Sequence, residues 1–395
     1  MSADPVALMP AVTGAKGDPF TIAAADRLGP LRVTLVIANL SGAGAQKIIT
    51  MMANHWSMRG WDVTLIALDS EADDTYFAVD PRVRVVRLGV VGVSPTPLHG
   101  LVSNLRRIAR LRRAVRASRP EVVVSFLTTT NVRVLIACWG LDVPVLVSER
   151  ADPRHQAIGS VWRALRLVTF ATASRVVAQT ETALGHFPAF IRRRGIVLPN
   201  PVVLPDQPAR ATEHVVAGVG RLEPLKGFDI LVAAFARCAP SHPDWRLTIW
   251  GVGSQERRLI ALAKELGIAD RFSLPGRSRL PGDWVNSAGI FALSSRHEGF
   301  PNVLLEAMAA GLPAVATDCP PGAPRAMIAD GETGVLVANQ DVAALAAALD
   351  RLMADPAERR RLGHAARRRA DERFALPRVM ARWTALLHEA ATRRR

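Results

Sequence analysis

SSRHEGFPNVLLEAMAAGLPAVATD, residues 294–318, combines a polar loop with the pattern of a short helix. A short apolar strand ends at Leu293, and the loop that follows holds Glu298. Pro301 has the fixed φ angle that suits the first turn of a helix, and Gly311 suits the left-handed residue that closes one. The pattern therefore predicts a strand, a polar loop and a helix between these two residues.

The start of this helix is a favourable place for an anionic or hydroxyl-rich ligand. Its free amides would lie beyond the carboxyl end of a parallel strand, where open α/β sheets bind ligands and helix N-termini receive phosphate oxygens. Glu298 precedes the helix and Glu306 lies about one turn inside it, so each carboxylate would hold a different part of one ligand. A solvated Glu298 and a Glu306 satisfied by a cap or an ion pair would fit the same spacing.

Working outward, short β-rich runs alternate with helix-length segments in both directions. In the N-terminal half the runs are residues 33–38, 63–68, 83–88, 122–126, 143–147 and 175–178. In the C-terminal half they are residues 215–219, 246–250, 271–274, 290–293 and 314–316. Continuous apolar runs suit strands that are buried on both faces, and the alternation predicts βαβ units and parallel sheets.

The Pro-rich segment 198–211 divides the chain into two halves. We expect an α/β protein with two Rossmann-like domains that face a central cleft, and a C-terminal helical tail. The expected ranges are a loose tail over residues 1–30, an N-terminal domain over 31–203, a C-terminal domain over 204–375, and a last helix over 376–395 that crosses back to the N-terminal domain.

Composition limits the class of protein. The chain has 395 residues, 49% of them hydrophobic, which excludes a disordered chain. Its three cysteines lie far apart and suit neither a disulfide scaffold nor a zinc site, and scattered thiols fit the cytosol. No apolar run reaches the ~18 residues of a spanning helix, and the first 30 residues lack the pattern of a secretory signal. The net charge of +15 favours anionic partners.

A second group of polar residues lies in GVGRLEPLKGFD, residues 218–229. It follows the first strand of the C-terminal half, so its loop would open at the same sheet edge as Glu298. The fork of Arg221 suits a diphosphate, and Lys226 adds a mobile positive charge. Fixed cations of this kind stabilise a diphosphate leaving group without a metal. Two ordinary surface cations are the alternative.

Together, GRLEPLKGFD (220–229), EGFPNVLLE (298–306), DCPPGAP (318–324) and DGETGVLV (330–337) resemble the retaining GT-B glycosyltransferases of the family 4 type, also called group 1 transferases. The resemblance implies that the N-terminal domain binds the acceptor and the C-terminal domain binds a nucleotide sugar, with no metal or other cofactor. It implies that Arg221 and Lys226 bind the donor diphosphate, that Glu298 contacts the donor sugar and that Glu306 bonds the ribose. The donor-binding residues are then Gly42, Gly44, Arg221, Lys226, Glu298, Gly299, Phe300, Pro301, Asn302 and Glu306.

The N-terminal half matches this family more loosely. SGAGAQK (41–47) resembles its glycine-rich loop, in which Gly42 and Gly44 would let the backbone approach the donor phosphates, although Gln46-Lys47 replaces the usual Glu-Arg. A plain tight turn is the alternative. Ser148-Glu149-Arg150 stands where many relatives carry His, and this version is similar to bacterial lipid-linked or surface-polysaccharide transferases that use UDP-N-acetylhexosamines. Glu149 or Arg150 would then position the acceptor or the donor sugar, with Glu149 in the catalytic set beside Arg221, Lys226 and Glu298, unless the two form a structural ion pair.

The basic charge is concentrated in NLRRIARLRRAVRASRP (104–120), which carries seven arginines. Apolar residues recur at helical spacing between them, which predicts an amphipathic helix with a basic outer face. A solvated face and attachment to an anionic membrane both fit this pattern. The resemblance implies a lipid-linked or polysaccharide acceptor, such as a polyprenyl diphosphate glycan, and a cytoplasmic, peripheral position at the inner face of the plasma membrane. For the apolar run over 161–175 we expect a buried helix, with a hydrophobic contact to the membrane as the alternative.

Three rival functions are compatible with parts of the sequence. Nucleic-acid binding would use the positive charge, but the chain shows no recognised binding motif and has a single tyrosine. A non-catalytic, partner-binding subunit of the same fold is the main alternative, because the usual His is missing. A sugar phosphorylase would need a pyridoxal-phosphate lysine motif, which we do not find. We therefore expect a metal-independent, retaining hexosyltransferase that uses a nucleotide sugar, with UDP favoured by the resemblance.

Overall fold

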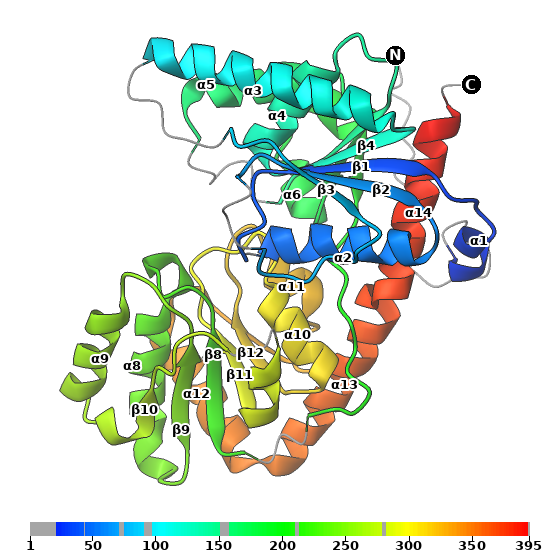
Figure 1. Cartoon of the computed structure of the whole chain (residues 1–395). Helices are drawn as coiled ribbons and strands as arrows, with labels where there is room; N and C mark the ends of the chain where they lie inside the picture. Colours follow the sequence, from blue (N-terminus) through cyan, green and yellow to red (C-terminus); the bar gives the residue numbers. More distant parts are fainter. Residues whose placement is uncertain are drawn as a thin grey trace, which may run out of the picture.

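The apolar runs form the central strands of two parallel sheets in the computed structural model (Figure 1). The structure describes residues 21–42, 44–70, 75–90, 97–150, 158–209, 213–278 and 282–393. Each sheet is covered by helices on both faces, so the chain has two α/β domains, as the sequence predicts.

The N-terminal sheet has seven parallel strands in the order β3-β2-β1-β4-β5-β6-β7. The strands are β1 (Arg32–Ile37), β2 (Asp62–Ala67), β3 (Arg84–Arg87), β4 (Val122–Phe126), β5 (Val145–Ser148), β6 (Arg175–Ala178) and β7 (Gly195–Val197). The helices are α2 (Gly44–Met58), α3 (Pro97–Ser118), α4 (Thr128–Cys138), α5 (Ser160–Phe170), α6 (Glu181–Gly185) and α7 (Ala189–Arg192). Helix α2 covers one face of the sheet, while α3, α4 and α5 cover the other.

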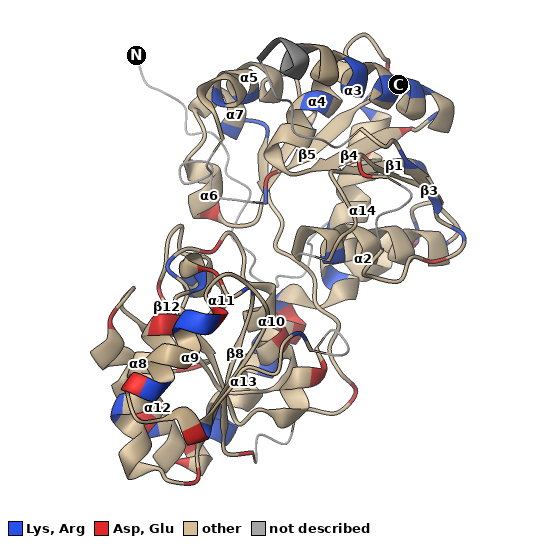
Figure 2. Ribbon diagram, turned by 60° about the vertical axis from the view of Figure 1, so that its left-hand side comes forward, with Lys and Arg blue, Asp and Glu red and all other residues tan. Residues whose placement is uncertain are grey.

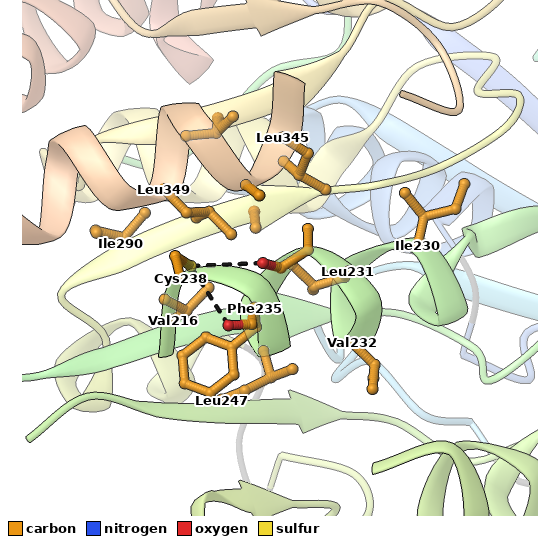
Figure 3. Packing of buried hydrophobic residues seen from close by; sticks show 14 of the residues in the cluster. Val216, Ile230, Leu231, Val232, Phe235, Cys238, Leu247, Ile290, Leu345 and Leu349 are labelled. Atoms are coloured by element: carbon orange, nitrogen blue, oxygen red, sulfur yellow. Dashed lines mark hydrogen bonds between the residues drawn. The ribbon is translucent and has the colours of Figure 1, made fainter. Parts of the chain in front are cut away.

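The C-terminal sheet has six parallel strands in the order β10-β9-β8-β11-β12-β13. The strands are β8 (Val215–Val219), β9 (Arg246–Trp250), β10 (Phe272–Ser273), β11 (Ile290–Leu293), β12 (Ala314–Thr317) and β13 (Val335–Val337). The helices are α8 (Phe228–Cys238), α9 (Glu256–Glu265), α10 (Asn302–Ala310), α11 (Ala323–Met327), α12 (Val342–Ala354) and α13 (Pro356–Phe374). Figure 3 shows how Leu231 and Phe235 of α8 pack with Leu345 and Leu349 of α12 over this sheet.

In each sheet the strand order reverses between two neighbouring central strands. The reversal lies between β1 and β4 in the N-terminal sheet and between β8 and β11 in the C-terminal sheet. Open α/β sheets bind ligands outside the carboxyl ends of the strands at this switch point. The loops that the sequence singles out follow β1, β5, β8 and β11, so they lie at these edges.

The last helix, α14 (Leu376–Thr392), crosses back and packs in the core of the N-terminal domain (Figure 1). Trp383 and Met380 are fully buried there, and the indole nitrogen of Trp56 donates a hydrogen bond to Thr384 at 3.0 Å. Since α13 packs on α10 of the C-terminal domain, the two final helices connect the domains.

Some expectations at the ends of elements are wrong. The predicted loose tail contains a short helix, α1 (Ile22–Asp26), which packs against α14; residues 1–20 lie outside the described residues. Pro301 is the N-cap of α10 instead of its first helical residue, and strand β7 had no counterpart in the sequence analysis. Helix α5 is not buried, because Val161 and Val168 are about two-thirds exposed. Within the described residues, no helix has the length and apolar content needed to cross a membrane.

Candidate functional site

The loop between β11 and α10 holds Glu298 in a buried position. The residue is only 7% exposed, and its Oε1 accepts hydrogen bonds from Lys226 Nζ at 2.5 Å and from Ser295 Oγ at 2.7 Å. The backbone N–H of Glu298 donates to the carbonyl of Pro320 at 3.0 Å. Glu298 is therefore a fixed, ionic group at the carboxyl edge of the sheet, and the alternative of a solvated side chain is wrong.

The start of α10 lies directly after this loop. Pro301, the N-cap, makes no side-chain capping bond and has no N–H of its own. Phe300 is buried, with its ring against Phe374, so Phe300 anchors the loop in the domain core. Gly311 adopts a φ of 76° and closes the helix, as its position predicts. Helix α10 thus presents a first turn without a side-chain cap, which favours an anion.

The β8–α8 loop packs closely on the Glu298 loop. Lys226 ends a short 3₁₀ helix, Pro224–Lys226, and Gly227 follows it with a φ of 61°. A side chain at Gly227 would collide with the carbonyl oxygen of Ser294, so only glycine allows this approach. A second contact between the two loops was not predicted from the sequence: Arg296 donates two hydrogen bonds to the carboxylate of Asp229, at 2.9 and 2.7 Å. Burial raises the pKa of Asp229, but the hydrogen bonds and charge of Arg296 outweigh burial and hold it below its usual value.

Arg221 is exposed at the same edge, and within the described part of the chain its side chain makes no hydrogen bond or ion pair. Lys226 lies across Gly220, the residue before Arg221, because its Cδ and Cε would be 3.5 Å from a Cβ placed there. The structure therefore brings Lys226 and Glu298 into direct contact, while the exposed Arg221 follows Gly220 in the same loop. There, hydrogen bonds and then the charge of Arg221 lower the pKa of Glu223. Among the described residues, no group of three or more His, Cys, Asp or Glu side chains is arranged to hold a metal ion.

Two contacts join the start of α2 to the start of α10 across the domain interface. Lys47 Nζ lies 2.5 Å from Glu306 Oε1, with the two side chains 23% and 16% exposed. One turn earlier, a Cβ added at Gly44 would lie 2.6 Å from Asn302 Nδ2, so the glycine allows this approach. The alternative that an ion pair satisfies Glu306 thus holds in this structure. Gly42 has a φ of 82° in the preceding turn, while residue 43 lies outside the described residues.

Glu149 and Arg150 directly follow β5 on the N-terminal side of the interface. Glu149 is buried, and its two oxygens accept bonds from Thr128 Oγ1 at 2.7 Å and from the N–H of Arg150 at 3.1 Å. Arg150 Nη1 donates to Asn200 Oδ1, and Asn200 Nδ2 donates to Asn302 Oδ1 at 2.6 Å. Asn200 was missed by the sequence analysis, although its place between two prolines in the interdomain segment was a usable signal.

Two family models match consecutive parts of the chain. Residues 43–201 match the family described as "Glycosyl transferase 4-like domain", and residues 204–369 match "Glycosyl transferases group 1". An α-1,4-N-acetyl-D-galactosaminyltransferase of Campylobacter jejuni, named for a PP-undecaprenol-linked acceptor, is 26% identical over 91% of this chain and 99% of its own length. An exopolysaccharide phosphotransferase of Streptomyces coelicolor is 29% identical over 89% of this chain but only 40% of its own length.

Solved structures show the same fold. HepE of Anabaena, in a complex with UDP and glucose, superimposes with a TM-score of 0.75 at 17% identity, over 91% of this chain and 99% of that one. The two family matches cover consecutive domains and meet at the Pro-rich boundary. The chain therefore belongs to the group 1, family 4-like glycosyltransferases of the GT-B fold.

Proposed function

We propose that the chain is a retaining glycosyltransferase that moves a hexose or N-acetylhexosamine from a UDP-linked sugar to a lipid-linked or polysaccharide acceptor in cell-surface glycan synthesis. The observation that carries this proposal is the contact between Lys226 and Glu298 beside the uncapped first turn of α10, with the exposed Arg221 in the same loop as Lys226. A diphosphate needs positive groups, and a sugar needs hydrogen-bond acceptors for its hydroxyls. This edge of the sheet offers both kinds of group within two adjoining loops.

Each part of the donor has a candidate partner. The diphosphate would lie between the first turn of α10 and the cations Arg221 and Lys226, with the backbone at Gly42 and Gly44 on its other side. Glu298 would accept hydroxyls of the sugar, and Glu306 would accept those of the ribose. Because Lys47 occupies Glu306 in this structure, donor binding would exchange that ion pair for hydrogen bonds to the ribose.

The chemistry proceeds on one face of the sugar. The acceptor oxygen forms a bond to the anomeric carbon while the bond from that carbon to the diphosphate breaks, and the acceptor proton passes to the departing phosphate. Glu298 and Lys226 bind each other, so we assign Glu298 to orientation and do not cast it as a nucleophile. Arg221 and Lys226 would stabilise the negative charge that develops on the leaving group, which is the basis for proposing that no metal is required.

The acceptor would reach the protein from a membrane surface. The relative in Campylobacter is named for an acceptor on PP-undecaprenol. Helices α3, α4 and α5 form one outer layer of the N-terminal domain, and Figure 2 shows Lys and Arg residues along α3. Trp139, Val161 and Val168 are exposed on the same layer, and apolar groups beside cations suit an anionic lipid surface. We therefore propose a peripheral position on the cytoplasmic face of the plasma membrane.

A donor screen tests this function. The purified chain would be incubated with UDP-, GDP- and ADP-sugars and membrane lipid extracts, and mass spectrometry would detect a lipid-linked product one sugar heavier. We expect transfer from a UDP-sugar, with the anomeric configuration of the donor kept. An inverted product would contradict retention, and transfer from GDP- or ADP-sugars alone would contradict the choice of nucleotide. Nucleotide binding without transfer to any acceptor would favour the alternative, a non-catalytic partner-binding subunit.

A further inference from the structure

Arg150 lies where the N-terminal domain faces α10 of the C-terminal domain. It follows β5, and its guanidinium carbon lies 3.7 Å from the centre of the Phe126 ring at the end of β4. Nη1 donates to Asn200, which in turn donates to Asn302, the first residue of α10. Two hydrogen bonds therefore connect Arg150 to the helix turn where the proposed function places the donor diphosphate.

The edge of the Arg150 guanidinium formed by Nε and Nη2 has no hydrogen-bond partner among the described residues. Both atoms are also closed to solvent. These two groups form the side-on edge of the fork, which binds two oxygens of a phosphate or carboxylate at once. Arg296 of this protein shows a related two-point contact, because its Nη1 and Nη2 bind the two oxygens of Asp229.

The charge of Arg150 also lacks a counter-ion at contact distance within the described residues. Glu149, its neighbour in sequence, uses its carboxylate for Thr128 and for the backbone N–H of Arg150. Burial lowers the pKa of Arg150 to about 9, with the charge of Glu149 opposing this shift, so the side chain remains a cation at neutral pH. A desolvated cation without a counter-ion destabilises the folded state, which is typical of a group that meets its counter-ion in a substrate.

We propose that Arg150 is a substrate-binding residue whose Nε and Nη2 bind phosphate oxygens at the domain interface. This proposal rests on the proposed function and deepens it, because it assigns a phosphate contact to the N-terminal domain. The phosphate comes either from the nucleotide sugar or from a diphosphate-linked acceptor, and both sources share the same chemistry. Glu149 then acts as a positioning residue that holds the start of α4 and the backbone of Arg150.

Binding measurements on three variants test the assignment. Arg150→Met removes the charge and the fork, and Arg150→Lys keeps the charge alone. Arg359→Met is the matched control, because Arg359 is also buried and stacked on an aromatic ring, Trp245, but donates to the carbonyls of Leu352 and Met353 far from the interface. Calorimetry would measure the affinity for UDP as the donor probe and for farnesyl diphosphate as the acceptor probe, and urea unfolding would measure stability.

We expect Arg150→Met to weaken binding of one probe by about tenfold or more, with a smaller loss in Arg150→Lys, while its unfolding midpoint stays equal to or above that of the wild type. A loss for UDP identifies the donor phosphate, and a loss for farnesyl diphosphate identifies the acceptor phosphate. Arg359→Met should show the reverse, with lower stability and unchanged affinity.

Two results would overturn the assignment of Arg150 alone. One is an Arg150→Met protein that binds every probe within twofold of a wild type that binds UDP. The other is a loss of affinity that only accompanies a loss of stability as large as that of Arg359→Met. A wild type that binds neither probe would instead contradict the proposed function, and the assignment of Arg150 would fail with it.

Discussion

Lys226 and Glu298 stabilise each other in the site. Their charged atoms lie 2.5 Å apart, and both side chains are largely buried, at 21% and 9% exposed. Removal of either partner would leave the other as a buried charge without compensation, so each substitution affects more than its own substrate contact. Arg221 makes no such pair among the described residues, and its substitution therefore reports more directly on the substrate.

The first prediction concerns these two cations. Arg221→Ala and Lys226→Ala should each lower the rate of sugar transfer more than tenfold, because one lost charge-stabilising donor is typically worth about 2.7–4 kcal/mol in the transition state. Initial rates with a UDP-sugar would measure the loss. Urea unfolding of both variants serves as a control, and we expect Arg221→Ala to be as stable as the wild type because its side chain is exposed.

Activity should also persist in EDTA, since fixed cations take the place of a metal in the proposed mechanism. Complete loss of transfer in chelator, restored by Mg²⁺ or Mn²⁺, would contradict the metal-independent assignment. Near-wild-type rates in both arginine and lysine variants would contradict the diphosphate assignment.

The second prediction separates the two glutamates. Glu306→Ala should mainly weaken UDP binding, because the ribose is held in both ground and transition states. Glu298→Ala should mainly lower kcat, because its contact would orient the sugar at the reacting carbon. Calorimetry with UDP and steady-state kinetics would separate the effects. An unchanged UDP affinity in Glu306→Ala would show that the ribose assignment is wrong.

At the scale of elements, helices α2 and α10 meet with their N-terminal ends at the domain interface. The pair Lys47–Glu306 lies one turn inside each helix, beyond the Gly44–Asn302 contact. Both helix ends carry partial positive charge, so their approach favours an anion between them. The ion pair is partly exposed, which limits its contribution to about 0.2–1 kcal/mol.

The third prediction uses this pair. A double-mutant cycle of Lys47→Met and Glu306→Gln, measured by urea unfolding, should give a coupling of about 0.2–1 kcal/mol without ligand. In saturating UDP the coupling should fall to near zero, because the ribose would take the place of Lys47 on Glu306. A coupling that keeps its full size in UDP would show that the ion pair survives donor binding.

The fourth prediction concerns the buried end of α2. Burial, together with the positive charge of Arg59, lowers the pKa of His55 from 6.5 to about 4. Between these pH values the unfolded chain binds a proton that the folded chain does not, so the free energy of unfolding should fall as the pH drops from 6.5 towards 4. The loss attributable to His55 is up to about 3 kcal/mol.

Urea unfolding of the wild type and of His55→Gln at pH 7, 6 and 5 would measure this loss. The variant should lose less stability over the same range, because it has no titrating group at this position. Parallel curves for the two proteins would assign the acid sensitivity to other residues.

At the scale of the whole molecule, the outer layer of α3, α4 and α5 lies away from the domain interface (Figures 1 and 2). Arg133 of α4 connects the three helices, since it donates to Asn104 of α3 and stacks over Trp162 of α5 at 4.7 Å. Leu105 of α3, one of the apolar residues at helical spacing in this segment, is 58% exposed beside the arginines. The layer therefore combines cations and apolar side chains on one face.

The fifth prediction tests this face as a membrane contact. Replacing Arg106, Arg110 and Arg113 by Gln removes three exposed charges, each worth about 1 kcal/mol near an anionic surface. Co-sedimentation with anionic vesicles at low salt should show a drop in affinity of about a hundredfold. UDP binding in the C-terminal domain should not change.

A matched control removes the same charge elsewhere. Arg360, Arg361 and Arg368 are exposed on α13 of the C-terminal domain, and their replacement by Gln should leave vesicle binding within a fewfold of the wild type. Equal losses in both triple variants would indicate attraction by net charge alone. No loss in the α3 variant would identify a solvated face.

Much of the fold followed from local sequence patterns. The strand runs predicted β4, β6, β8, β9 and β11 with their observed bounds, because short runs rich in apolar and β-branched residues between turn-forming segments mark a strand locally. Helix α1 was missed because a five-residue helix is marginal on its own and depends on packing against α14. The exposure of α5 was missed because a short apolar helix has the same pattern whether a core or solvent covers it.

For the candidate site, too, some features could be predicted from the sequence and others only from the tertiary structure. The amino-acid sequence determined that Lys226 and Glu298 lie on loops at one sheet edge, because each loop follows a strand and the carboxyl ends of parallel strands share one edge. Only the tertiary structure decided that Lys47 meets Glu306, 259 residues away, and that Asn200 meets Asn302, 102 residues away. Such contacts depend on how two separately folded domains are placed against each other, and a local pattern carries no record of that placement. The environment of Arg150 was also beyond a local pattern, because its partners Phe126 and Asn200 come from distant parts of the chain.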